Sequence, residues 1–576
     1  MAQERRIHLR RPGPRPRSLL ADIPLLAAVL LLFYTFVRMS HVASAPLTHP
    51  AVLSLSPFAI PGYMALSLLR MSVAFVASVL FSLSYGYAAA HSPWAERILI
   101  PILDILQSVP VLGFLSFTVT AFVALDPGTM VGPNLASVFA IFTAQAWNMA
   151  FSFYHSLRTI PPDLNEAANV YGLSPWRRFL RLELPAAMIP YVWNSVLSFG
   201  ASWVFLTASE AVTVASHHII LPGMGSYIAT AIVRGNVGDL LDAVLAFVLT
   251  IVLLDQVVWR PLIAWSQRFQ LTLGPAKEES ESWALTLLTR SALLPWLARA
   301  VFEPISRFVL RRRLRNPLPF ESRPVRPWVG RAILALALVG LVSLLLPALV
   351  HLVIEMLTLS AGVYFTYILA GLATLGRVLL AVLLGALWTV PAGVAIGQSP
   401  RLTTYLEPFV QNAAAFPANI LYGFLVPVLL FMHLSMNFGS ILLMMLGTQW
   451  YILFNVIAGT QGLPSDLLEA CQVFGIQGLR RWRTVILPGI FPTLITGALT
   501  AAGGAWNLSI LAEITSWGHT RLVAFGLGSF ITENAAAGHT TLLFLAVFLM
   551  SVLVVSLNTF LWQPLYRLAE ARFHVE

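Results

Sequence analysis

The chain is poor in three kinds of residue, and each shortage excludes a class of site or protein. Its 576 residues include one cysteine, Cys471, so an intramolecular disulfide is impossible and a cysteine-based metal site is not expected. The one lysine, Lys277 in "LGPAKEES", lies outside any G-x-x-x-x-G-K-[ST] pattern, so we expect no ATP or other cofactor to bind this chain. Charged residues make up 10%, too few to cover a soluble globule of this length.

Apolar residues take the place of the missing charge. They supply 58% of the chain, and the mean hydropathy is +0.78, which predicts an all-α integral membrane protein. Many apolar runs reach the roughly 20 residues that a helix needs to cross a bilayer, and the ten-residue alternating strands of a barrel are missing. The arginines behind the net charge of +10 cluster beside these runs, which indicates contact with lipid and no nucleic-acid partner.

The apolar runs predict about 12 transmembrane helices in two sets of six. The first set falls near 19–38, 71–90, 98–124, 134–156, 186–208 and 240–260. The second set falls near 331–354, 377–397, 405–432, 438–458, 488–511 and 541–562. We expect the first run to be retained as a helix, because it lacks a convincing small-residue cleavage site.

Between the two sets lies a basic, proline-rich segment, 264–330, that we predict to be a cytoplasmic linker. The predicted domains are therefore 1–263, with its core at about 65–263, and 331–576, with its core at about 372–570. Since six crossings return the chain to the same side, both termini are predicted to be cytoplasmic.

The two predicted domains form an internal repeat. Arg70 and Pro110 match Arg377 and Pro417 at a constant spacing of 307 residues. A further set matches at a spacing of 303, namely Trp147, Trp203, Glu210, Gly225 and Trp259 with Trp450, Trp506, Glu513, Gly528 and Trp562. Because both domains begin and end on the same side, we predict two parallel repeats fused as a pseudo-dimer with a central interface.

One polar segment occurs in both repeats, "EAANVYGLSPWRRFLRLELP" from Glu166 and "EACQVFGIQGLRRWRTVILP" from Glu469. Asp163 and Ser465 can cap a short helix, and a glycine can end it in a left-handed turn. Ser174 and Pro175 can begin a second short helix, which Pro185 separates from the next span. The small residues Ala167 with Ala168, and Ala470 with Cys471, leave a surface that another protein could approach closely. The arginines of this segment could equally anchor the spans at the lipid headgroups.

The repeated segment resembles the signature of the permease subunits of binding-protein-dependent ABC importers. That signature is Glu-Ala-Ala, three residues, Gly, nine residues, an aliphatic residue, one residue and Leu-Pro. Its first copy is Glu166, Ala167, Ala168, Gly172, Leu182, Leu184 and Pro185. Its second copy is Glu469, Ala470, Gly475, Val485, Leu487 and Pro488, with Cys471 in place of the third small residue.

Within that family the chain is most similar to the nitrate, sulfonate, taurine and bicarbonate type. The similarity rests on "SLLR" ending at Arg70, "TLGR" ending at Arg377, "AWNLSILAEI" from Ala505 and "GLGS" from Gly526. The first repeat departs from it with "SWVFLTASEA" and "GMGS".

The resemblance implies a non-catalytic permease in a bacterial cytoplasmic membrane that carries a small solute, such as one of these anions. Segments 166–172 and 469–475 would each contact one of two ABC ATPase subunits, identical or different, which would hold ATP and Mg. A separate extracytoplasmic binding protein would deliver the solute.

Seven residues are candidates for lining or gating the pathway: Arg70, Arg377, Trp203, Glu210, Trp506, Asn507 and Glu513. Arginine can offer paired donors to an oxyanion. The alternative, which we favour, is that each Glu and Arg fixes helix ends through an ion pair, with the Trp at the membrane interface. His217 and His218, near Arg234, do not predict a metal site, since they lack a third ligand.

Other functions stay open. A ferric-iron importer permease, also often a fused double, is the alternative within the family. An ion-coupled secondary transporter also uses repeats, but it normally needs mid-membrane acidic residues and no paired docking loops. A membrane enzyme is less favoured, because no catalytic constellation is recognisable.

Overall fold

The computed structural model describes residues 53–214, 217–269 and 350–573, together with residues 34, 35, 37, 286, 340, 343, 346 and 347. It divides into two units, Met1–Val37 with Leu254–Ala348 and Arg38–Leu253 with Leu349–Glu576. Most of the predicted spans 19–38 and 331–354, most of the predicted linker, and Lys277 lie outside the described residues. The larger unit contains both copies of the repeated segment.

The first repeat begins with a short 3-10 turn, η2 (Pro57–Ala59). Its elements in the larger unit are then α2 (Ile60–His91), α3 (Pro93–Ser108), α4 (Val111–Leu125), α5 (Val131–Arg158), α6 (Pro162–Val170), α7 (Pro175–Arg178), the π-helical turn η3 (Phe179–Glu183), α8 (Leu184–Glu210), β1 (Ala211–Val214), β2 (His217–Ile220), α9 (Met224–Arg234) and α10 (Val237–Leu254). The smaller unit adds η4 (Asp255–Trp259), α11 (Arg260–Ser266) and η5 (Gln267–Phe269).

The second repeat has the same order of elements. They are α15 (Ala361–Gly397), α16 (Pro400–Ala415), α17 (Ala418–Phe431), α18 (Met436–Gln461), α19 (Ser465–Val473), α20 (Gly478–Arg481), the π-helical turn η6 (Trp482–Ile486), α21 (Leu487–Ala512), β3 (Ile514–Trp517), β4 (Thr520–Val523), α22 (Leu527–Ala537), α23 (Thr540–Leu557), η7 (Asn558–Trp562) and α24 (Gln563–Phe573). The predicted internal repeat is thus confirmed element by element.

The membrane-spanning helices agree with the predicted all-α membrane class. Within the described ranges, seven helices are long and apolar enough to cross a bilayer, or eight if the bent pair α16–α17 is one span. The full number of 12 stays a prediction. Two short antiparallel hairpins, β1–β2 and β3–β4, are additions that hydropathy did not predict.

Two predicted spans, 98–124 and 405–432, are each broken into two helices. α3 and α4 separate before Pro110, and α16 and α17 separate before Pro417 with a bend of 85° between the second pair. Phe416, the residue before Pro417, is extended, as expected where a proline ring disfavours the helical conformation of its predecessor. The prediction of one continuous span at each of these two places was therefore wrong.

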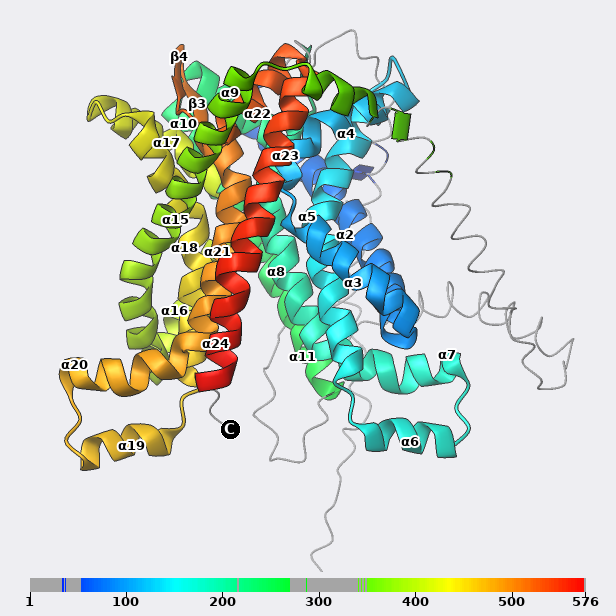
Figure 1. Cartoon of the computed structure of the whole chain (residues 1–576), viewed down its shortest axis with the longest axis vertical. Helices are drawn as coiled ribbons and strands as arrows, with labels where there is room; N and C mark the ends of the chain where they lie inside the picture. Colours follow the sequence, from blue (N-terminus) through cyan, green and yellow to red (C-terminus); the bar gives the residue numbers. More distant parts are fainter. Residues whose placement is uncertain are drawn as a thin grey trace, which may run out of the picture. The chain divides into compact units, whose positions relative to one another are not determined.

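The large unit has two distinct ends (Figure 1). α6 with α7 and α19 with α20 lie at one end of the long helices, which we call the loop end. β3, β4, α9 and α22 lie at the opposite end, which we call the hairpin end.

The two repeats share one hydrophobic core. It contains side chains of α4, such as Leu112 and Leu115, together with many from the second repeat, such as Trp506. Near the hairpin end, Asn419 of α17 donates to Thr207 of α8 through its Nδ2 at 2.9 Å. The packing agrees with the predicted pseudo-dimer and its central interface.

Candidate functional site

The repeated segment folds into the same motif in both copies, which we call the first helical loop (residues 162–183) and the second helical loop (residues 465–486). Gly172 and Gly475 have φ values of 60° and 64°, in the left-handed region that glycine adopts without strain. The amide of Leu173 donates to the carbonyl of Ala168 at 3.1 Å, which closes the helix end as in a Schellman motif. The predicted order of helix, glycine turn and helix is confirmed.

The boundaries of these short helices differ from the prediction. α6 begins at Pro162, so Asp163 lies in its first turn and does not cap it. Proline suits this position, because the first amides of a helix have no intrahelical partner. Pro185 does not separate α7 from the next span, because the chain continues through the π-helical turn η3 into α8. Proline is tolerated there because it follows a change in hydrogen-bond register.

The small residues of the signature are only partly exposed. Glu166, Ala167 and Glu469 are exposed, whereas Ala168 is 5% and Cys471 3% exposed. One small residue in each helical loop therefore packs inward and is not available to a partner. This explains why cysteine can replace alanine at 471, since either side chain is small enough for a buried position.

The most exposed apolar side chains of the loops stand just before the glycines. Tyr171 is 82% and Phe474 77% exposed, and the valines before them, Val170 and Val473, are equally open. Exposed apolar side chains at equivalent places of both loops suggest a contact surface. The sequence signal for this surface was the pair of apolar residues before each glycine in an otherwise polar segment.

Arg70 and Glu210, two pathway candidates, form a buried ion pair at the hairpin end. Arg70 Nη1 donates to Glu210 Oε1 at 2.6 Å, and both side chains are fully buried. Ser67 Oγ donates to the same oxygen at 2.7 Å, and the amide of Gly225 donates to Oε2 at 2.7 Å. Arg70 Nε donates to Asn134 Oδ1 at 2.8 Å, so the pair joins α2, α5, α8 and α9.

The second repeat builds the same arrangement with different neighbours. Arg377 Nη1 donates to Glu513 Oε1 at 2.7 Å, and Thr374 Oγ1 donates to that oxygen at 2.8 Å. The amide of Gly528 donates to Glu513 Oε2 at 2.8 Å, and Arg377 Nη2 donates to Asn437 Oδ1 at 2.7 Å. Each carboxylate is compensated by charge and by donors, as a buried charge requires.

Glycines make room for these ion pairs. A Cβ added at Gly223 would overlap the carboxylate of Glu210, and one at Gly526 would overlap that of Glu513. Sequence reasoning matched the arginines and the glutamates between repeats but missed Ser67, Thr374 and the two asparagines as their partners.

The two tryptophan candidates are buried inside the protein and do not face lipid. Trp203 and Trp506 are each 1% exposed, and Trp203 packs edge to face against Phe199 and Phe247. The predicted position of these rings in an interfacial belt was wrong. They fill the core, where a large aromatic ring buries much apolar area.

Asn507, the remaining candidate, belongs to a polar face of α21. Thr496, Thr500 and Gly503 are exposed and Asn507 is half-buried, and their spacing of four, three and four residues places them on one side of the helix. Ile510, seven residues after Gly503, lies beside Gly113 of α4, a helix of the first repeat. The polar face is therefore turned towards the first repeat.

The corresponding face of α8 is apolar and is closed at Gly200, although Leu197 on the same face is 37% exposed. It carries Trp193, Leu197, Gly200 and Val204, at a spacing of 303 from the residues of α21. A Cβ added at Gly200 would lie 3.0 Å from Ala415 Cβ of α16 in the second repeat. No atom of the described part of the chain would lie within 4 Å of one added at Gly503.

His217 and His218 pair as part of β2 with β1, and Arg234 is the last residue of α9. Among the described residues, no group of three or more His, Cys, Asp or Glu side chains is arranged to hold a metal ion. The site therefore consists of the two helical loops at one end, the buried ion pairs at the other and the polar face of α21 between them.

Comparison with known proteins finds one family twice in the chain. The model described as "Binding-protein-dependent transport system inner membrane component" matches residues 78–258 and 381–572. The nitrate import permease protein NrtB of Leptolyngbya laminosa is 30% identical over 200 residues, which cover 33% of this chain and 68% of that protein. The bicarbonate transport system permease protein CmpB of Synechococcus elongatus is 27% identical over 206 residues, 36% of this chain and 67% of that protein.

One relative matches along both repeats. The trimethylamine N-oxide transport system permease protein TmoV of Ruegeria pomeroyi is 22% identical over 551 residues, which cover 87% of this chain and 76% of that protein. A match of this length agrees with a fused double form.

Proposed function

Because the chain belongs to the family of binding-protein-dependent transport system inner membrane components, we propose that it forms the whole pathway of an ATP-driven importer. It is a multi-pass, non-catalytic membrane component, and its two family domains stand in one chain. In this proposal each helical loop contacts one of two cytoplasmic ABC ATPase subunits, which hold ATP and Mg. The closing and opening of the ATPases then switches the permease between outward and inward access.

The observation that carries the proposal is the pair of matching helical loops at one end of the large unit (Figure 1). Both loops hold a glutamate on an exposed helix and an aromatic ring at the glycine turn. Two equivalent projecting surfaces suit two copies of one kind of partner. A headgroup anchor needs the arginines but not this repeated apolar tip.

The docking part of the proposal can be tested by charge reversal. In a chain co-expressed with its ATPase subunits, Glu166→Lys together with Glu469→Lys should release the ATPases or uncouple their ATP hydrolysis from transport. Glu533→Lys of α22 at the hairpin end is a matched control, because its exposed ion pair with Arg521 contributes little to stability. Stable and fully active complexes after both loop changes would contradict the proposal.

The remaining assignments follow from the placement of the loops. If the loop end is cytoplasmic, the hairpin end receives the extracytoplasmic binding protein, and both termini are cytoplasmic, as the arginine distribution predicts. The domain limits 1–263, 264–330 and 331–576 remain proposals for the same chain.

For the substrate we propose a small anion such as nitrate, sulfonate, taurine or bicarbonate. Two relatives, a nitrate and a bicarbonate permease, support this class, although a third, a trimethylamine N-oxide permease, widens the range of solutes. The solute would pass the exposed threonines of this face of α21 and the half-buried Asn507, whose Oδ1 is buried without a hydrogen-bond partner among the described residues. A ferric-iron importer permease is the alternative, and the solute that stimulates ATP hydrolysis only with its binding protein would decide between them.

The buried ion pairs have a different role in the proposal. The guanidinium groups of Arg70 and Arg377 donate to a carboxylate and to neighbouring oxygens, so few of their N–H groups remain to bind a passing anion. We therefore assign both pairs to fixing the hairpin end of each repeat, and leave only Asn507 among the original candidates on the pathway.

A further inference from the structure

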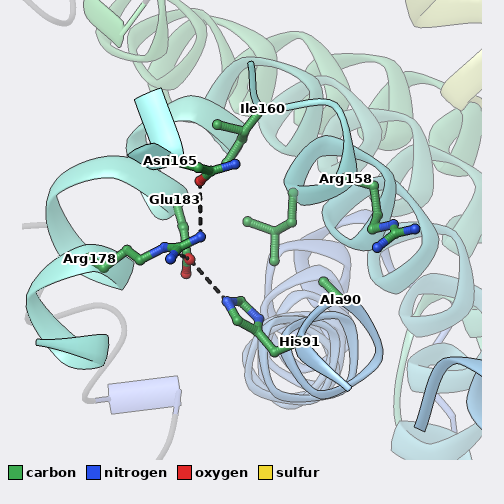
Figure 2. A pocket seen from close by; sticks show the side chains of 8 residues that line it. Ala90, His91, Arg158, Ile160, Asn165, Arg178 and Glu183 are labelled. Carbon is green, nitrogen blue, oxygen red and sulfur yellow. Dashed lines mark hydrogen bonds and ion pairs between the residues drawn. The ribbon is translucent and has the colours of Figure 1, made fainter. Parts of the chain in front are cut away.

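At the loop end of the first repeat, a buried carboxylate joins three separate elements. Figure 2 shows Glu183 of η3 with His91, the last residue of α2, and Arg178, the last residue of α7. His91 Nε2 and Arg178 Nε each lie 2.9 Å from Glu183 Oε1. The Glu183 side chain is 3% exposed, and its Oε2 is buried without a hydrogen-bond partner in the described structure.

The same arginine continues the connection into α6, the helix that carries the signature glutamate. Arg178 Nη2 donates to Asn165 Oδ1 at 3.0 Å, and Nη1 donates weakly to Asn169 Oδ1 at 3.4 Å. A path of polar contacts therefore runs from α6 through Arg178 and Glu183 to His91 of α2. The fixed fork of a guanidinium suits such a bridge, because it can hold a carboxylate and an amide oxygen at once.

The second repeat lacks this path. The residues at the same spacings are Gln398 for His91, Ile486 for Glu183 and Leu468 for Asn165. Ile486 is 2% exposed and belongs to the main hydrophobic core. Arg481 is the equivalent of Arg178. The Nε of neither arginine makes a hydrogen bond among the described residues, so the two differ in the ion pair of Arg178 with Glu183, which an isoleucine at 486 cannot form with Arg481.

A role in general architecture does not explain this difference. The ion pair at the hairpin end occurs in both repeats and fixes the helices of both. At the loop end, the second repeat has an apolar side chain, Ile486, where the first has Glu183, so the fold there does not require a carboxylate. An apolar residue in place of a buried ion pair is often neutral or stabilising, so a carboxylate at 183 needs a reason other than stability.

The surroundings of the path leave room for movement. A cavity of about 220 Å³ adjoins Glu183, His91 and Arg178 and is also lined by Leu157, Arg158 and Ile160. Figure 2 shows the labelled side chains of His91, Arg158, Ile160, Arg178 and Glu183 around this space. The cavity therefore gives the Arg178 and Glu183 side chains space to change their contacts when α6 shifts.

We propose that Glu183 is a positioning residue that joins the first helical loop to α2, and that the second helical loop has no such link among the residues that the structure describes. This rests on the proposed docking of an ATPase subunit at α6. Movement of α6 passes through Arg178 and Glu183 to the loop end of α2, whose other end holds Arg70 at the hairpin end. The two ATPase contacts are consequently unequal, and the first controls α2 directly.

The first experiment measures the link without any partner. Amide hydrogen exchange of residues 162–172 in the purified full chain should be at least about threefold faster in Glu183→Gln than in wild type. Residues 465–475 should be unchanged in the same sample, which controls for loss of global stability. Equal exchange of residues 162–172 in both proteins would overturn the link.

The second experiment measures coupling in the complex of the chain with its ATPases and binding protein, in liposomes. Glu183→Gln should still retain the ATPases, but solute moved per ATP hydrolysed should fall about fivefold, within the range of ordinary coupling energies. Glu183→Asp, which keeps the carboxylate, should recover most of the ratio. Gln398→His, the matched change in the second repeat, should leave it unaltered.

Results of the second experiment separate the two proposals. A wild-type chain that retains no ATPase would contradict the proposed function, whereas a retained ATPase with an unaltered ratio in Glu183→Gln would overturn the role of Glu183. Should Glu183→Gln fail to fold, His91→Gln offers a milder change at a side chain that is 35% exposed. It should lower the ratio about twofold, and an unaltered ratio there would equally overturn the proposal.

Discussion

The two repeats share the construction of the hairpin end and differ at the loop end and along one helix face. In each repeat a buried Arg–Glu pair with matching hydrogen-bond donors fixes one long helix, α2 in the first repeat and α15 in the second, to the helices that follow it. Only the first has the His91–Glu183–Arg178 path, and only the second presents an open polar face on α21. In the proposed importer, features kept in both repeats serve the architecture, and features kept in one repeat divide mechanical coupling from solute contact.

The largest expected effect tests the shared feature. Glu210→Gln and Glu513→Gln each leave a buried guanidinium without its charge partner, so each should destabilise the protein by about 3 to 5 kcal/mol. Reversible unfolding in detergent would measure this, and the two values should be similar because the two sites are built alike. A large loss in one repeat with none in the other would contradict a common architectural role.

The next effect concerns the exposed tips of the helical loops. Tyr171→Asp or Phe474→Asp should weaken ATPase binding at that loop about tenfold, because apolar area lost from a contact centre is costly. Titration of ATPase onto the immobilised chain would measure it. Phe58→Asp is the matched control, since Phe58 is 96% exposed and precedes α2 near the hairpin end. If the tip variants and the control bound the ATPase with equal affinity, Tyr171 and Phe474 would not be part of the docking surface.

A smaller effect sharpens the comparison of α8 with α21. Asn507→Leu should lower the rate of solute uptake at low solute concentration about threefold, as expected for a lost polar contact of below 1 kcal/mol. Val204→Leu, the matched change on α8, should leave uptake unaltered because that face is already apolar. The initial rate of uptake into liposomes is the measurement, and equal losses for both variants would show that the faces are equivalent.

The smallest effect concerns the one cysteine. Cys471→Ala should change stability by about 1 kcal/mol or less and should leave ATPase binding unaltered, because the side chain packs inward. Alkylation of Cys471 in the folded chain should accordingly be slow compared with the unfolded chain. A clear loss of ATPase affinity in the alanine variant would place the sulfur on the docking surface after all.

Local patterns in the sequence predicted the parts of the fold that depend on neighbouring residues. Gly172 and Gly475 marked their turns correctly, because a left-handed backbone requires glycine at that point. Hydropathy alone missed the breaks before Pro110 and Pro417, because an average over some twenty residues does not register one proline. The start of α6 was misplaced by two residues, because the cap is Pro161 and not Asp163, and Pro162 starts a helix as readily as Asp163 caps one.

Partners distant in the sequence were harder to predict. Arg70 was placed at the start of a span, although it lies inside α2, because Glu210, which neutralises it, is 140 residues away. The path through Glu183 was missed for the same reason, since His91 precedes it by 92 residues. The repeat itself offered the only signal, because Ile486 occupies the place of Glu183 in an otherwise well-matched segment.

Solute uptake into liposomes that contain the chain, its two ATPase subunits and the binding protein tests the central claim most directly. Uptake should require ATP on the side of the ATPases and should persist when ion gradients across the membrane are collapsed. Uptake that continues without ATP and stops on collapse of an ion gradient would contradict an ATP-driven importer and favour an ion-coupled secondary transporter.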